Sequence, residues 1–347
     1  MQMRSKNSYT DQELCEATQV AYFNITQEYL AEYRRTHNGG SPTLQEIVEE
    51  KGPDIYSGYG RMDAVIGDRL KIKQSIENFC ASIAAGDVCA GWKIVSVSDS
   101  NSEDGFYGVL IETDSNHAIV AFRGSESVTI RQIIKDWIQA DLGLIQNVPT
   151  QQQLKAGQYL DEIGSHFSYD QYAVTGHSLG GNLAIFSAVY AATEDCVSDI
   201  GSKIVQCVNF DGPGQTREFI ETYRDAINKQ QSVMMHYQWS LVGSILTSVC
   251  GDHYKMIVSE GFSSLLFKHS TASVVFLNGM MVPSEILDNL AMLTHNLTNH
   301  CDTDEELHEV LAALVKMAGD TSDHVLQMLK LCDPCNLLLD LLETEAG

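Results

Sequence analysis

A serine that could act as a nucleophile lies in the middle of the chain, at Ser178 in the run Gly176-His-Ser-Leu-Gly180. The apolar residues 171–175 before it predict a strand, and the small residues from Leu179 to Ala192 predict a helix. The two glycines suit a sharp turn between them, because a β-carbon at either position would strike the neighbouring strand and helix. A serine held at such a turn is typical of a nucleophile elbow.

A serine hydroxyl becomes reactive only with a base to take its proton and with donors for the charge that develops on the attacked carbonyl oxygen. The helix that begins at Leu179 offers one donor, because its first backbone N–H groups have no partner within the helix. A second strand is predicted at His117 to Phe122, and the Arg123-Gly-Ser125 loop that follows it can furnish the other donor.

An amphipathic segment follows that loop directly, over residues 126–142. Its apolar residues recur at helical spacing, at Ile130, Ile133, Ile134 and Trp137. Two interpretations stay open: a helix that packs on the sheet, or a mobile lid whose apolar face covers the site.

Together with the run around Ser178, the stretches Phe122 to Ser125 and Asp136 to Leu142 resemble the class 3 lipases of the α/β-hydrolase superfamily. The later run Val208-Asn-Phe-Asp-Gly-Pro-Gly214 is more similar to a bacterial branch, the lipase-like family known as Mbeg-like. The resemblance covers roughly Gly91 to Val275. It implies an α/β-hydrolase fold, with a mostly parallel central sheet flanked by helices.

The resemblance also assigns roles to individual residues. It implies that Ser178 is the nucleophile and that the backbone amides of Leu179 and Ser125 form the oxyanion hole. It makes Asp141 a structural partner of Arg123 rather than a catalyst.

The base should be a histidine late in the chain, since α/β-hydrolases order their triads as serine, acid, histidine. Of the eleven histidines, only His236, His253 and His269 follow the elbow and precede the helical tail. Catalytic groups of parallel sheets gather at the carboxyl ends of the strands. His253 lies at the amino end of a predicted strand and His236 in the middle of one, whereas His269 follows the last strand. We therefore predict that His269 is the base.

The acid is where the chain departs from the class 3 pattern. Those lipases carry an aspartate where this sequence has Ser240, after a predicted strand that ends near Trp239. Asp211 ends the preceding strand and is the first candidate, with Glu260 as the alternative. A third possibility is a Ser178/His269 dyad in which Ser240 or a backbone carbonyl orients the imidazole. Asp211 could equally be a turn residue of Asp-Gly-Pro-Gly.

A chain of 347 residues with 44% hydrophobic content can bury one large core with helical additions. We predict an N-terminal helical segment at residues 1–90, a catalytic core at 91–282 and a C-terminal helical extension at 283–347, within one compact unit. The extension could pack across the site or mediate self-association, so a homo-oligomer stays open. Helices are also predicted at 10–32, 43–51, 63–85, 215–229 and 241–250, and strands at 204–210, 232–239 and 254–260.

The net charge of −24 disfavours binding to nucleic acid and to anionic bilayers. No apolar run of 18 residues and no hydrophobic leader is evident, so neither membrane insertion nor a signal peptide is expected. Nine scattered cysteines indicate free thiols in a reducing cytoplasm. The Cys332/Cys335 pair and the histidines near Cys301 do not have the spacing of a closed metal site, and no cofactor is expected.

Three functions remain open at this stage. The first is a serine esterase or lipase acting on a neutral acyl ester through an acyl-enzyme. The second is another serine hydrolase, such as a thioesterase or amidase. The third is a non-catalytic scaffold of the same fold, which the missing carboxylate at Ser240 would allow.

Overall fold

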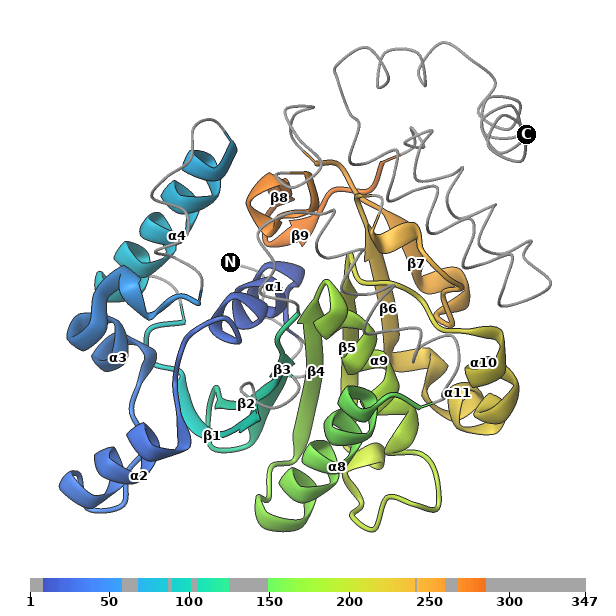
Figure 1. Ribbon diagram of the computed structural model, residues 1–347, viewed down its shortest axis with the longest axis horizontal. Coiled ribbons are helices and arrows are strands. Elements are labelled where there is room, and N and C mark those ends of the chain that lie inside the picture. Colours follow the sequence, from blue (N-terminus) through green and yellow to red (C-terminus); the bar gives the residue numbers. More distant parts are fainter. Residues whose placement is uncertain are drawn as a thin grey trace, which may run out of the picture.

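The computed structural model describes residues 9–57, 68–86, 89–100, 105–124, 149–240, 242–259 and 268–284. Its centre is a seven-stranded sheet whose strands lie in chain order (Figure 1). The strands are β1 (Lys93–Ser100), β2 (Phe106–Glu112), β3 (His117–Phe122), β4 (Gln171–His177), β5 (Ile204–Phe210), β6 (Met234–Gln238) and β7 (Tyr254–Met256). β2 runs antiparallel to β1 and β3, and β3 to β7 are parallel. All parallel strands therefore end at one edge.

Helices cover both faces of this sheet. They are α1 (Asp11–Val20), α2 (Gln27–Thr36), α3 (Leu44–Lys51), α4 (Asp68–Ala84), α8 (Gln151–His166), α9 (Leu179–Tyr190), α10 (Arg217–Thr222) and α11 (Arg224–Gln230). One core forms between the sheet and α8, α9 and α11. A second forms on the opposite face, where α1 packs with α3 and α4. The described residues thus form a three-layer α/β arrangement, completed by a small hairpin of β8 (Phe276–Leu277) and β9 (Met280–Met281).

β3 shows why its sequence is apolar without alternation. Ala118, Val120 and Phe122 enter the core on the α9 side, whereas Ile119 and Ala121 enter the core on the α1 side. Both faces of a parallel strand are buried in such a fold, so both sets of side chains are apolar. Burial of each large side chain contributes about 1.5–3 kcal/mol.

The N-terminal helix α1 is attached to the sheet by polar contacts as well as by packing. The Tyr237 hydroxyl in β6 donates to Asp11 Oδ1 at 2.9 Å, and the Met281 backbone amide in β9 donates to Asp11 Oδ2 at 2.9 Å. A capping box between Thr10 and Glu13 begins the helix. Helix α1 therefore packs directly against strands that follow it in sequence.

Several predicted elements differ in the structure. The predicted helix at 241–250 is wrong where it is described: a short 3₁₀ turn, Val242–Ser244, is followed by loop. The amides of Gly214 and Gln215 bond to the carbonyls of Ile245 and Thr247. This segment therefore pairs with a neighbouring loop instead of forming helical i to i−4 bonds.

Other differences concern element ends. The predicted helix at 10–32 is broken between Val20 and Gln27, and the one at 215–229 is divided at Tyr223. β7 ends at Met256, although the Ile257 amide still bonds to Gln238. Hydrogen bonds to residues distant in sequence determine where these elements end, and the periodicity of the local sequence does not contain that information. The C-terminal extension beyond 284 lies outside the described residues.

Candidate active site

Ser178 lies at the turn between β4 and α9, at the carboxyl edge of the sheet. Its backbone has φ 59° and ψ −135°, a conformation that non-glycine residues adopt only under strain. The Ser178 amide continues the strand ladder by donating to the carbonyl of Phe210 at 3.0 Å. The sheet therefore holds the backbone of this serine at the start of the helix.

The glycines of the elbow are required by close backbone contacts. A β-carbon on Gly176 would lie 2.1 Å from the Gly180 carbonyl oxygen, and one on Gly180 would lie 2.2 Å from the Phe122 carbonyl oxygen. Neither backbone could move away without breaking the sheet or the helix. The turn around Ser178 thus has the geometry of a nucleophile elbow.

The structure brings His269 and Asp211 together, although they are far apart in sequence. His269 Nδ1 lies 2.7 Å from Asp211 Oδ2, and both side chains are buried. Because an ionised carboxylate only accepts, the proton of this hydrogen bond belongs to Nδ1 of the imidazole. Nε2 of a neutral His269 is then left with a lone pair, as a general base needs.

The backbone around Asp211 fixes the direction of its carboxylate. The backbone amides of Trp239 and Ser240 donate to Asp211 Oδ1 at 2.8 and 2.9 Å, which leaves Oδ2 for His269. Asp211 itself has φ 52°. The Asn209 side chain supports the turn by accepting from the Gly212 amide at 2.8 Å. Asp211 therefore both begins the Asp-Gly-Pro-Gly turn and holds the imidazole of His269.

Ser240 occupies the position at which class 3 lipases carry their aspartate. Its hydroxyl lies 3.2 Å from His269 Nδ1, farther than Asp211, and also accepts from the Val242 amide at 3.1 Å. The shorter contact and the negative charge make Asp211 the stronger partner of His269.

Ser178 Oγ and His269 Nε2 are both buried, and neither has a hydrogen-bond partner in the part of the chain that the structure describes. These are the two atoms between which a serine proton would pass. In unliganded enzymes such bonds are often long and shorten only when substrate binds.

The oxyanion side of the site is described in part. Leu179 is the first residue of α9, so its amide has no acceptor within that helix. Gly124 packs on the elbow, since a β-carbon there would lie 2.9 Å from Ser178 Cβ and 2.6 Å from the His177 carbonyl oxygen. Ser125, the segment 126–142 and Glu260 lie outside the described residues.

The other two histidines considered for the base lie elsewhere. His253 precedes β7, and its Nδ1 lies 3.1 Å from the Met234 carbonyl oxygen at the opposite edge of the sheet. His236 is buried within β6. Sequence reasoning missed the contacts of Trp239 and His177 with His269, because nothing in strand periodicity reports where an aromatic ring points.

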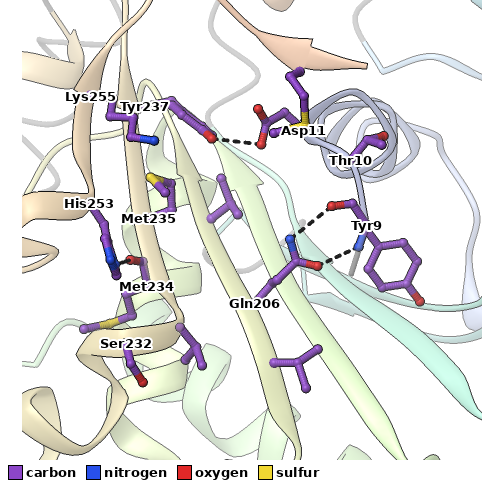
Figure 2. Close-up of a pocket in the computed structure, with 14 residues that line it drawn as sticks. Tyr9, Thr10, Asp11, Gln206, Ser232, Met234, Met235, Tyr237, His253 and Lys255 are labelled. Atoms are coloured by element: carbon purple, nitrogen blue, oxygen red, sulfur yellow. Dashed lines mark hydrogen bonds between the residues drawn. The ribbon is translucent and has the colours of Figure 1, made fainter. Parts of the chain in front are cut away.

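A cavity of about 490 Å³ lies away from this site, over β5, β6 and the start of α1 (Figure 2). Its polar side chains include Gln206, Lys255 and Asp11, and the last of these is held by Tyr237. Neither Ser178, His269 nor Asp211 lines it. Among the described residues, no group of three or more potential ligands could hold a metal ion. No helix in the same residues is long and apolar enough to cross a bilayer.

The mostly parallel sheet, the strand–elbow–helix unit and the loops at the carboxyl edge define an α/β-hydrolase fold. The chain belongs to the Mbeg1-like family, whose sequence profile matches residues 92–314. Among solved structures it is similar to M37 lipase, with 14% identity and a TM-score of 0.37, over 67% of this chain and 68% of that one. No curated protein matches it in sequence.

Proposed function

We propose that the protein is a serine hydrolase that cleaves a neutral acyl ester through a Ser178-His269-Asp211 triad. One observation carries this proposal: the 2.7 Å contact between buried His269 and Asp211, at the sheet edge where the strained Ser178 begins α9. A turn residue alone would not need its carboxylate directed at an imidazole.

The reaction would proceed in two steps. His269 Nε2 takes the Ser178 proton as Oγ attacks the ester carbonyl, and then gives that proton to the departing alcohol. The resulting acyl-enzyme is cleaved by a water molecule that His269 deprotonates in the same way, and the proton returns to Ser178. Asp211 holds the imidazole in the required tautomer and stabilises its transient positive charge.

The charge on the tetrahedral intermediates would be stabilised by backbone amides. We assign these to Leu179 and Ser125, each contributing about 3 kcal/mol to lowering the barrier when well aligned. Segment 126–142 lies outside the described residues, and the two roles considered for it remain a helix that packs on the sheet and a lid over the acyl site. No metal or organic cofactor takes part in this scheme.

The net charge and the cysteine content limit the choice of substrate and of cellular compartment. A net charge of −24 disfavours anionic membranes and nucleic acid, so we propose a neutral, moderately apolar ester. Cys15, Cys207 and Cys250 are buried free thiols, which supports a reducing cytoplasm. A thioesterase or amidase would use the same groups, and a panel of oxygen esters, thioesters and amides separates these activities.

The test is labelling with a fluorophosphonate probe, with the adduct located by mass spectrometry. We expect a stoichiometric adduct on Ser178 in the wild type, none in Ser178→Ala, and strongly slowed labelling in His269→Ala. An intact, folded wild type that neither labels nor hydrolyses any ester in the panel would favour the non-catalytic scaffold. Circular dichroism and thermal unfolding of each variant show whether loss of labelling reflects loss of fold.

A further inference from the structure

The side chain of His177, directly before the nucleophile, packs on the proposed base. The ring centroids of His177 and His269 are 4.6 Å apart with the planes tilted by 32°. The ring of His177 also stacks with that of Trp239, with the centroids 6.0 Å apart and the planes at 14°. His177 is buried, so its ring is a direct neighbour of the proposed base inside the protein.

The hydrogen bonds of His177 explain why an imidazole is present. Its Nε2 lies 2.8 Å from the backbone carbonyl oxygen of His269. The indole Nε1 of Trp239 donates to the same oxygen at 3.3 Å. Two side-chain donors thus hold the backbone of His269, and a carbonyl oxygen has two lone pairs to receive them.

These contacts determine the tautomer of His177. A carbonyl oxygen only accepts, so Nε2 of His177 carries the proton and Nδ1 carries a lone pair. The hydroxyl of Tyr22 lies 3.5 Å from that Nδ1 and is the group placed to donate to it. Burial, followed by the neighbouring charge of His269, lowers the pKa of His177 to about 3. The ring therefore stays neutral beside an imidazole that must become positive during the reaction.

We propose that His177 is a positioning residue for His269 and that Tyr22 donates a hydrogen bond to Nδ1 of His177. Tyr22 lies outside the residues that the family profile matches. This inference rests on the proposed function. His177 contacts neither the reacting proton nor the attacked carbonyl. It acts by fixing the backbone of His269 relative to Ser178, with Trp239 as the second donor.

Three variants separate positioning from packing. His177→Gln keeps a donor where Nε2 was, His177→Asn has too short a side chain to reach the carbonyl, and His177→Phe keeps the ring without a donor. We expect the fluorophosphonate labelling rate of Ser178 to fall about tenfold in the Phe and Asn variants and to stay within about threefold of wild type in the Gln variant. Thermal unfolding should show all three folded. Equal rates in the Phe variant and wild type, or a Gln variant slower than the Phe variant, would overturn the proposal.

A second measurement does not depend on activity. Long-range ¹H–¹⁵N correlation spectra should show one neutral imidazole protonated on Nε2 that does not titrate between pH 5 and 9 and is absent in His177→Gln. In Tyr22→Phe the Nδ1 resonance of that ring should move. A His177 that titrates in this range, or that carries its proton on Nδ1, contradicts the inference. A wild type that gives the expected spectrum without labelling would instead place the failure in the proposed function.

Discussion

The isosteric change Asp211→Asn tests the proposed triad most directly. An asparagine keeps an oxygen for the amides of Trp239 and Ser240, at present 2.8 and 2.9 Å from Oδ1. Its NH₂ group then replaces Oδ2, 2.7 Å from His269 Nδ1. Since NH₂ only donates, Nδ1 would have to accept, and the proton would move to Nε2.

The expected loss follows from that tautomer. With a proton on Nε2, His269 cannot take the proton of Ser178. The same change in a Ser-His-Asp triad lowers kcat about 10⁴-fold, so we expect a loss of about 10³ to 10⁴-fold, or roughly 4–5.5 kcal/mol of barrier. The fold should survive, because the two amide contacts are retained.

The assay compares fluorophosphonate labelling rates of wild type, Asp211→Asn and Ser240→Ala at one pH. Ser240→Ala is the matched control, since it removes only the 3.2 Å contact with His269, and a loss below about tenfold is expected. A mild effect of Asp211→Asn together with a severe effect of Ser240→Ala would refute the reasoning and favour the dyad. Glu260→Gln should label at the wild-type rate.

A relocated acid extends the same test. Ser240 Oγ already lies 3.2 Å from His269 Nδ1, so a carboxylate at that position can reach the imidazole. In the Asp211→Asn background, Ser240→Asp should restore labelling at least tenfold over Asp211→Asn alone. No recovery in a folded double variant would show that the amides of Trp239 and Ser240 place the carboxylate in a way that position 240 cannot reproduce.

Three further predictions concern stability and reactivity. Burial raises the pKa of Glu16 to about 7 from its ordinary 4.5, so ionising this carboxyl costs stability as pH rises through that range. In urea denaturation at pH 8, the free energy of unfolding of Glu16→Gln should exceed that of wild type by about 1–2 kcal/mol, and below about pH 4 the two should not differ. The exposed control Glu49→Gln should show no difference at either pH. Gly180→Ala should lose more than about 3 kcal/mol or fail to fold, because its β-carbon would meet the Phe122 carbonyl at 2.2 Å; wild-type thermal stability in this variant would contradict the elbow geometry. Burial raises the pKa of the Cys207 thiol well above its usual value, so peptide mapping after iodoacetamide at pH 8 should find it modified only once the chain is unfolded.

The helix predicted at 241–250 shows how a local pattern can mislead. The segment has apolar residues at helical spacing, yet its backbone bonds to the loop at Gly214 and Gln215. Those partners lie about thirty residues earlier in the chain, and no window of local sequence contains them. The same limit applies to His177, whose place inside the elbow was evident while the direction of its ring was not.

The sequence by itself determined the elbow, because strand, turn glycines and helix are contiguous and each acts within a few residues of Ser178. Chain order and the carboxyl edge of the sheet led to the prediction that His269 is the base. Which group faces its Nδ1 was decided only by tertiary structure. Asp211 and His269 are 58 residues apart, and they meet because β5 lies beside β6, whose following amides direct the carboxylate. Turn chemistry and imidazole binding predict the same aspartate at the end of β5, so only its three-dimensional partners distinguish them.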